Sequence, residues 1–384
     1  MVNIAEPRIL IIADDLTGAM DAAGPFAARG MCTWVVACPD DCDASTLSGA
    51  QVVSVNTESR HLDAVAAAAR VTDCHRRVGG DGFTVVVKKI DSTLRGNVVA
   101  ETVATLRATG LGTTVVAPAF PAQGRTVRGG RVFVRDVALE DTAFVRDALS
   151  PALAVPLAQA FAAAGVSAMV LDASTDADLD AIIADLPRTG PVPLIVGSAG
   201  ITSALARALA RQGSGRPAPN ITGRIVYVIG SRAQASREQV ARLAADGAMV
   251  VRAPNGVPSS TPVVTDQDCL VLLAVPDDAG REGDAACVAR SLAVHALELA
   301  RLPGTGALVA TGGDTAIALL RASGNAALEV EGELMPGIAC AKLMLDGAAI
   351  GLVTKAGGFG DPEALREIGR RLRGTPASTA NRGG

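Results

Sequence analysis

The sequence predicts an α/β protein of two domains, each with a mostly parallel sheet covered by helices. At 384 residues the chain is long enough for two or three domains with cores of their own. Short apolar runs alternate with helical patterns, which is typical of parallel strands covered on both faces. Residues 213–224 are rich in Gly, Ser and Pro, and the alternation restarts after them. We therefore expect an N-terminal domain at 1–212, a linker at 213–224 and a C-terminal domain at 225–384.

The N-terminal domain begins with Ile9–Ala13, a wholly apolar run that suits a central strand. Thr17 and Gly18 then form a tight turn into an Ala-rich helical segment. Residues 152–171 carry no charge, but Pro156 and Gly165 interrupt them, so a surface helix and a buried strand are expected there instead of a membrane span. Strands are expected at Thr33–Ala37, Gln51–Val55, Phe83–Val87, Thr113–Ala117, Ala168–Leu171 and Leu194–Val196, and helices at Asp63–Val78 and Ala199–Gln212.

The C-terminal domain repeats this alternation. A strand at Ile225–Ile229 is followed by the turn Gly230-Ser231 and a helix near Ala233–Ala245. The last helix is expected to start with Asp361 as its N-cap and Pro362 at its first position. Further strands are expected at Ala248–Val251, Leu270–Val275, Ala307–Ala310 and Ile350–Val353.

Composition argues against several classes of function. The net charge is −4 and aromatic residues form 2% of the chain, so the sequence offers neither a basic surface nor stacking platforms for nucleic acid. The apolar run Ile9–Ala13 is too short for a signal peptide. The seven cysteines form no C-x-x-C pair, which indicates reduced thiols. We expect a cytoplasmic protein with small-molecule partners and with neither a nucleic-acid nor a membrane partner.

Two adjacent carboxylates, Asp14 and Asp15, follow the first strand directly. In open α/β sheets, ligands bind beyond the carboxyl ends of the strands, which is where this pair would lie. The alternative is a solvated turn with a helix cap, and the pair alone does not decide between the two.

A second polar cluster follows the strand expected at Phe83–Val87 and would emerge at the same sheet edge. Cations there could hold a carboxylate, and Ser or Asp side chains could bind hydroxyl groups. The chain has 31 arginines and four lysines, so a retained lysine suggests a need for a compact charge. The alternative is a helix start with solvated lysines. The cluster consists of Lys88, Lys89, Asp91, Ser92 and Arg95.

Two further strand ends carry cations. Arg60 follows the strand at Gln51–Val55 and could clamp a carboxylate with two hydrogen bonds. The Pro-rich loop 117–126 carries Gln123, Arg125 and Thr126 at the same rim. For this loop, a turn without a binding function is an equal alternative.

The C-terminal domain carries three glycine-containing turns between strand and helix: Gly230-Ser231, residues 310–316 and residues 354–360. Glycine lets backbone amides approach a phosphate, and a helix N-terminus adds a favourable partial charge. Lys355 lies beside the third turn. The chain contains no P-loop motif and no G-x-G-x-x-G after a strand. These turns therefore favour nucleotide binding of another type.

Taken together, these stretches resemble the four-carbon acid-sugar kinase family. They occur in the family's order over nearly the whole chain, although a segment between about Ser150 and Ala168 is shorter than usual. The turn after Ser231 also lacks the usual Pro and Thr. The matching stretches are Ala13–Ala19, Asn56–Arg60, Lys88–Gly96, Ala117–Arg125, Gly230-Ser231, Thr311–Thr315 and Lys355–Gly360.

The resemblance implies ATP-dependent phosphorylation of an acid sugar of the threonate, erythronate or 3-oxo-tetronate type, with ATP and Mg²⁺ as cofactors. It places the acid sugar on the N-terminal domain, ATP on the C-terminal domain and the active site in the cleft between them. The acid-sugar residues would be Asp14, Arg60, Lys88, Lys89, Ile90, Asp91, Ser92 and Arg95. The ATP residues would be Ser231, Thr311, Gly312, Gly313, Asp314, Thr315, Lys355, Gly357 and Gly358. No metal ligand is assigned, and a homodimer is left open.

In this hypothesis Arg60 and a lysine of the 88–89 pair hold the substrate carboxylate. Asp15 orients or deprotonates the attacking hydroxyl, with Asp91 as the competing candidate. Two alternatives remain: a non-catalytic protein that binds a sugar acid, and an isomerase or aldolase acting on a phosphorylated sugar.

Overall fold

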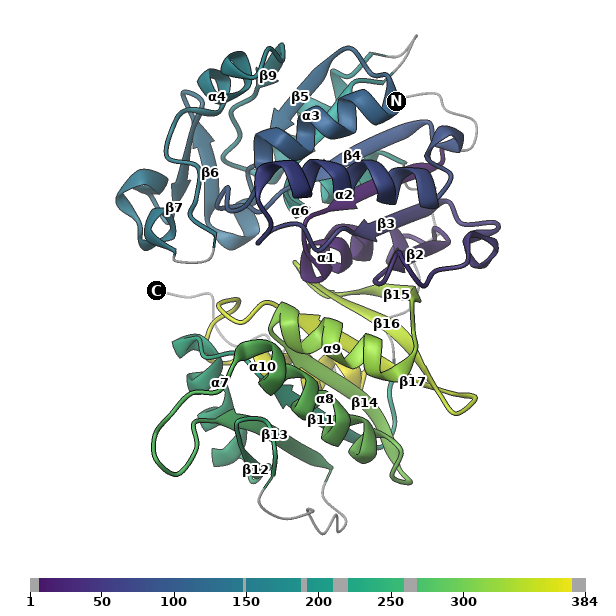
Figure 1. Ribbon diagram of the computed structural model, residues 1–384, viewed down its shortest axis with the longest axis vertical. Helices are drawn as coiled ribbons and strands as arrows, with labels where there is room; N and C mark the ends of the chain where they lie inside the picture. The colour runs from purple at the N-terminus through teal and green to yellow at the C-terminus, as the bar shows by residue number, and fades with distance from the viewer. Residues whose placement is uncertain (1–6, 148–149, 188–191, 210–219, 259–267, 375–384) are drawn as a thin grey trace. The chain divides into compact units, whose positions relative to one another are not determined.

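The chain divides into two compact units, Met1–Arg216 and Pro217–Gly384. We describe each unit from a computed structural model, over residues 7–147, 150–187, 192–209, 220–258 and 268–374 (Figure 1). Most of the expected linker, residues 213–219, lies outside the described residues, as do residues 210–212 of the expected helix. Within the expected linker, Asn220 forms an isolated bridge with Arg373.

The first unit is built on a parallel sheet with the strand order β2-β3-β1-β4-β10-β5-β9. β1 lies inside this sheet and is buried along its whole length, because all five of its residues are apolar. This matches the expected α/β fold class. The strands are β1 (Ile9–Ala13), β2 (Thr33–Val36), β3 (Val52–Asn56), β4 (Val85–Lys89), β5 (Thr114–Ala117), β9 (Ala168–Val170) and β10 (Leu194–Gly197).

Helices cover this sheet, with α2 packed on α3 and α1 packed on α6 (Figure 1). Side-chain caps fix several starts: Asp15 caps α1, Asp63 caps α2, and Thr175 forms a capping box on α5. The helices are α1 (Leu16–Ala27), α2 (Ala64–Arg77), α3 (Val98–Thr109), α4 (Leu157–Ala163), α5 (Asp176–Ala184) and α6 (Ala199–Leu209). Short 3₁₀ turns lie at Ala44–Leu47, Gly80–Gly82, Pro121–Gln123, Leu139–Asp141 and Ala143–Arg146.

A small antiparallel sheet, not expected from the sequence, follows β5. It consists of β6 (Arg125–Arg128), β7 (Arg131–Val134) and β8 (Val137–Ala138). The backbone amides of Gly129 and Gly130, at the tip of the first hairpin, donate to the carboxylate of Asp172 at 2.6 and 2.8 Å. Within 152–171, the helix is observed as α4, whereas the strand β9 is half-exposed at the sheet edge.

The second unit has its own sheet, in the order β12-β13-β11-β14-β17-β16-β15. Five strands are parallel, and β15 and β16 form an antiparallel hairpin that the sequence did not reveal. The strands are β11 (Arg224–Ile229), β12 (Met249–Pro254), β13 (Cys269–Val275), β14 (Thr305–Thr311), β15 (Ala327–Met335), β16 (Ile338–Leu345) and β17 (Ala348–Lys355). The helices are α7 (Gln234–Ala245), α8 (Ala285–Ala300), α9 (Gly313–Ser323) and α10 (Ala364–Leu372).

The expected start of the last helix is wrong by two residues. Asp361 accepts a hydrogen bond from the Glu363 amide within the preceding turn, and Glu363 takes the N-cap position of α10. Among the helices of the described residues, none combines the length and the apolar character that a membrane crossing requires.

Candidate functional site

Asp14 and Asp15 lie at the carboxyl end of β1 and share one arginine. Arg60 Nε and Nη2 donate to the two oxygens of Asp14 at 2.7 and 2.9 Å, and Nη1 donates to Asp15 Oδ2 at 2.6 Å. Burial raises the pKa of Asp14, but Arg60, Lys88 and Lys89 outweigh it and hold that pKa below its usual value. The Arg60 guanidinium is therefore bound by two protein carboxylates.

Asp15 differs from Asp14 in its exposure to solvent. Its side chain is 24% exposed, against 4% for Asp14. Its Oδ1 accepts a hydrogen bond from the Gly18 amide at 2.8 Å, which makes Asp15 the N-cap of α1. Asp15 thus caps a helix, as one of the two sequence alternatives states, and it also lies in the carboxylate–arginine cluster.

Lys88 is fully buried, and its ammonium group is saturated by protein acceptors. It forms an ion pair with Glu101 at 2.8 Å and donates to the carbonyls of Ile12 and Lys89 at 3.0 and 2.8 Å. Three donors with three acceptors leave no free N–H for a ligand. Sequence reasoning missed Glu101. The only hint in the sequence is that an acidic residue occurs in the helix after the polar cluster.

Lys89 lies closer to the Asp14–Asp15 pair. Its Nζ donates to the Ile90 carbonyl at 3.1 Å and lies 3.5 Å from Asp21 Oδ1. It also lies 3.1 Å from the position that a Cβ on Gly18 would occupy, beside Asp15. Burial lowers the pKa of Lys89, but Asp21, Asp15 and Asp14 more than offset this and raise it. Lys89 is charged and adjacent to both aspartates.

Asp91 is held by Arg95 and by its own turn. Arg95 Nε and Nη2 donate to the two carboxylate oxygens at 2.9 and 3.0 Å, and the hydroxyl of Thr93 donates to Oδ2. Burial raises the pKa of Asp91, but Arg95 and Arg60 outweigh it and place that pKa far below its usual value. A carboxylate held in this way is a poor proton acceptor.

The remaining residues of this cluster contribute in different ways. The side chain of Ile90 is buried in the core, and its backbone amide donates to the Gly197 carbonyl at 2.9 Å. Ser92 is partly exposed in the turn. The helix after this cluster begins at Val98 with Asn97 as its N-cap, so the alternative of a helix start at Asp91 or Ser92 is wrong.

The three glycine-containing turns of the second unit meet at the carboxyl ends of β11, β14 and β17, which are neighbours in the sheet. A Cβ on Gly230 would lie 2.0 Å from Thr315 Oγ1, and a Cβ on Gly357 would lie 2.0 Å from Ser231 Oγ. Gly312 is the N-cap of α9 with φ of 105°, a conformation that favours glycine. The first amides of α9 are thus presented beside Ser231.

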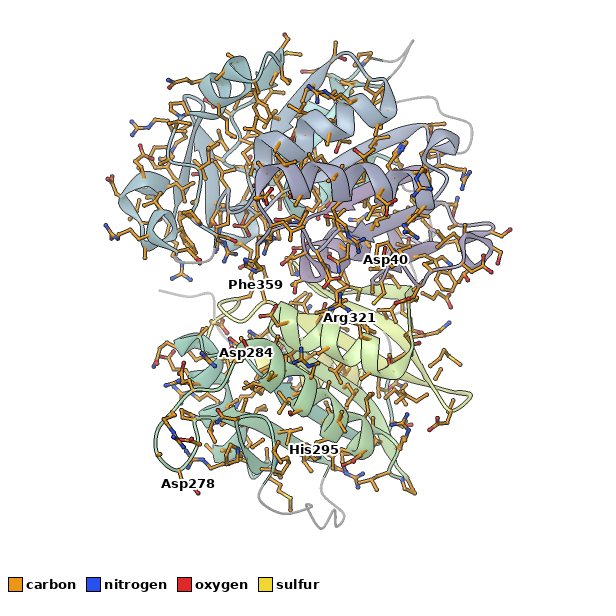
Figure 2. The ribbon with its side chains drawn as sticks, in the orientation of Figure 1. Asp40, Asp278, Asp284, His295, Arg321 and Phe359 are labelled. Carbon is orange, nitrogen blue, oxygen red and sulfur yellow. The ribbon has the colours of Figure 1, made fainter. Side chains whose placement is uncertain are left out.

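Lys355 is buried and organises the third turn from within. Its Nζ donates to the carbonyls of Ala356 and Phe359, both at 2.9 Å, and burial lowers its pKa to about 8. From α7, Ser236 donates to the Gly357 carbonyl at 2.8 Å and Gln239 donates to the Phe359 carbonyl at 3.0 Å. Phe359 is labelled on this loop in Figure 2. The lysine therefore positions the loop.

Beside these turns lies a pocket of about 330 Å³ at the carboxyl ends of β11, β12 and β13. Its wall includes Ser231 and three arginines, of which Arg232 pairs with Glu282 at 2.6 Å. The other two, Arg237 and Arg252, are exposed. Sequence reasoning missed both, because isolated arginines on a helix and a strand carry no motif.

In the described part of the chain, no three His, Cys, Asp or Glu side chains gather as a metal site. Magnesium bound with a nucleotide needs few protein ligands, because phosphates and waters supply the rest. Asp314, in the first turn of α9, is an exposed carboxylate next to Gly312 and Gly313. It is the sequence-predicted residue best suited to such a contact.

Comparison with known proteins identifies the family. Residues 9–163 match the model of a sugar-binding N-terminal domain, and residues 226–365 match a nucleotide-binding C-terminal domain. A D-threonate kinase from Bordetella bronchiseptica is 34% identical over 96% of this chain and 98% of its own length. The chain belongs to the four-carbon acid-sugar kinase family. A second member, a 3-oxo-tetronate kinase from Cupriavidus necator, is 29% identical over 94% of this chain and 98% of its own length.

Two solved structures have the same fold as this chain. A Salmonella typhimurium LT2 protein superposes with a TM-score of 0.73 at 21% identity, covering 94% of this chain and 98% of its own. A Haemophilus influenzae protein gives a TM-score of 0.67 at 20% identity, covering 94% of this chain and 100% of its own. At these identities the likeness concerns the fold alone.

Proposed function

We propose that the protein is an ATP-dependent kinase that phosphorylates a hydroxyl group of a four-carbon acid sugar. Residues of the Met1–Arg216 unit bind the sugar, and residues of the Pro217–Gly384 unit bind ATP. One structural observation carries the proposal: three turns converge on the N-terminus of α9 in a chain whose relatives include named kinases. A helix N-terminus with glycine in front of it suits a phosphate chain.

On the sugar side, Asp15 is the best candidate to orient or deprotonate the attacking hydroxyl. It is the more exposed carboxylate of its pair, and Arg60 fixes its position. Asp91 is less suited to this role, because its side chain is 13% exposed and Arg95 binds both of its oxygens, whereas Arg60 donates a single hydrogen bond to Asp15. Asp14 accepts two hydrogen bonds from Arg60 and would bind a sugar hydroxyl with its remaining lone pairs.

On the nucleotide side, the amides at Gly313 and Asp314 would contact phosphate oxygens, whereas the Gly312 amide already donates to the Lys355 carbonyl at 2.9 Å. Phosphoryl transfer requires positioning and neutralisation of charge, which amides, arginines and Mg²⁺ supply together. The Asp314 carboxylate would repel phosphates unless a cation lies between them, so it suits Mg²⁺ bound with ATP. Arg237 and Arg252 of the adjoining pocket add positive charge.

The test is coupled ADP release with MgATP over a panel of four-carbon sugar acids that includes D-threonate, D-erythronate and 3-oxo-tetronates. We expect acid-dependent ADP release with at least one of them. Tight binding of an acid without ADP release would favour a binding protein. Failure to bind MgATP, together with turnover of a phosphorylated sugar, would favour an isomerase or aldolase.

A further inference from the structure

The cations predicted to hold a substrate carboxylate are largely occupied by the protein itself. Arg60 is bound by Asp14 and Asp15, and Lys88 is bound by Glu101 and two carbonyls. Arg95 is bound by Asp91. An acid sugar brings one additional negative charge to this sheet edge. It therefore needs a cation whose charge is not already neutralised.

Arg125, the first residue of β6, is such a cation. In the described part of the chain, no carboxylate lies within 4.0 Å of its guanidinium group, and its Nε is buried without a hydrogen-bond partner. Its Nη1 donates to the Gln123 carbonyl. A buried donor left unpaired is costly and rare, so an acceptor is expected at this position.

The charges around Arg125 indicate that the expected acceptor is an anion. Burial lowers its pKa, and Arg135 and Arg95 lower it further, whereas Asp91 raises it. The guanidinium is therefore close to two like charges and to the carboxylate that already binds Arg95. A bound anion would relieve the repulsion among the three arginines.

The loop that carries Arg125 is closed by backbone hydrogen bonds and follows the carboxyl end of β5. Phe120 and Arg125 exchange backbone hydrogen bonds of 2.8 and 3.1 Å, which closes the turn between them. The hydroxyl of Ser198, after β10, donates to the Ala119 carbonyl at 2.9 Å. Because β10 lies between β4 and β5, this contact holds Arg125 beside the end of β4, where Asp91 lies.

We propose that Arg125, with Arg135 beyond it, binds the carboxylate of the acid sugar and makes the site selective for acids over neutral sugars. This inference rests on the proposed kinase function. A guanidinium group matches a carboxylate with two parallel hydrogen bonds, which also fixes the orientation of the substrate. Arg60 then has a different task, which is to hold Asp14 and Asp15 in place.

The test compares Arg125→Met, Arg125→Lys and Arg128→Met with the unaltered protein. Arg128 is a matched control on the same strand, because it is exposed, pairs with Asp136 at 3.1 Å and stacks on Phe133. Affinity for D-threonate and D-erythronate is measured by titration calorimetry without nucleotide. The neutral tetritols threitol and erythritol, which lack the carboxylate, are measured alongside as competitors.

We expect Arg125→Met to weaken acid binding on the order of 100-fold, the loss typical of a truncated charge pair. The acid affinity of Arg125→Lys should lie between those of Arg125→Met and the unaltered protein, since lysine keeps the charge and loses the planar guanidinium group. Tetritol binding and the Arg128→Met protein should be unchanged. In turnover assays, KM for the acid should rise while kcat at saturation stays within a few-fold.

Unchanged acid affinity in Arg125→Met would overturn the inference, as would an equal loss for acids and tetritols. If Arg125→Met fails to fold, as judged by circular dichroism, Arg125→Lys decides, and wild-type affinity in that variant contradicts the inference. The failures are separable. Acid-dependent ADP release with an unaffected Arg125→Met refutes this inference alone, whereas absent ADP release with selective acid binding refutes the kinase proposal alone.

Discussion

The two candidate sites are built in opposite ways. In the first unit, the strand ends carry charged side chains that are already paired, as in Arg60 with Asp14 and Asp15, and Lys88 with Glu101. In the second unit, the strand ends carry glycines and small hydroxyl residues, and backbone amides at the start of α9 form the surface. The site in the first unit therefore consists mainly of paired charged side chains, and the site in the second unit consists mainly of backbone groups.

This difference determines how each site can fail. In the charged site, removal of one partner leaves a buried opposite charge without compensation, which is costly. In the glycine site, an added methyl group meets a neighbouring side chain, because Gly230 and Gly357 lie against Thr315 and Ser231. The first site is therefore sensitive to deletion of atoms and the second to their addition.

The largest effect is expected from Asp15→Asn in the charged site. A well-placed base contributes roughly 10²–10⁴-fold to turnover, so kcat should fall by that factor while KM for the acid changes little. Asparagine is as good an N-cap as aspartate, so α1 should remain intact. The measurement is steady-state ADP release at saturating acid and MgATP, and near wild-type turnover would rule out Asp15 as the base.

The buried ion pair should give the largest effect on stability. Lys88→Met leaves the buried Glu101 carboxyl without its ion-pair partner, and we expect the free energy of unfolding to fall by about 3–5 kcal/mol. The single tryptophan, Trp34 in β2, reports on this unit in urea denaturation followed by fluorescence.

The control for this experiment is Arg77→Met, which breaks the exposed pair with Asp73 in the same unit. Surface pairs contribute little, so the denaturation midpoint should stay nearly unchanged. The double variant Lys88→Met/Glu101→Leu should recover part of the lost stability, because no charge is then left unpaired. Equal midpoints for Lys88→Met and the unaltered protein would mean that the pair is not buried in solution.

For the glycine site, Gly357→Ala should weaken nucleotide binding. Its new methyl group would lie 2.0 Å from Ser231 Oγ, and overpacking of this kind typically costs an amount equivalent to about 10–100-fold in affinity. Gly358→Ala meets no atom within 4 Å and should lose far less. Titration calorimetry with MgATP gives both values. Acid-sugar affinity should be unaffected in either variant, and equal ATP affinities would contradict this packing.

Much of the fold could be predicted from the sequence, because buried parallel strands are continuous apolar runs. Ile9–Ala13 and Ile225–Ile229 are examples, and both are central strands. The half-buried antiparallel strands escaped prediction. β15 alternates buried and partly exposed residues, and a search for continuous apolar runs misses such a strand although the alternation is itself a strand signal. The strands of the β6–β8 sheet are short, and arginines interrupt the apolar runs that mark the parallel strands.

For the candidate site, the sequence predicted which residues gather but not how they pair. Adjacent parallel strands bring Asp14 and Lys88 to one edge, which follows from topology alone. That Lys88 faces a helix carboxylate and Lys355 faces carbonyls depends on side-chain direction across the sheet, which single-sequence patterns do not specify. Arg125 was recognised at the rim, but the sequence does not show that its Nε is buried without a hydrogen-bond partner among the described residues.

The smallest expected effect concerns Lys355 in the glycine site, whose burial should make the stability of the protein depend on pH. Its pKa of about 8 lies below the ordinary value of 10.5 because of burial. Between these values the unfolded chain binds more protons than the folded one, so the free energy of unfolding should rise with pH, by up to about 1.4 kcal/mol per pH unit. Below about pH 8 both states are protonated and this contribution is constant.

The measurement compares urea unfolding of the unaltered protein and Lys355→Met, followed by circular dichroism between about pH 7 and about pH 10. Burial raises the pKa values of Tyr227 and Cys340, which makes stability fall with pH in the alkaline range. Both groups are common to the two proteins, so their contributions cancel in the difference. The unaltered protein should gain stability relative to Lys355→Met as pH rises from about 8. A difference that is independent of pH would mean that the buried ammonium keeps its ordinary pKa, and that the carbonyls of residues 356–359 compensate fully for its burial.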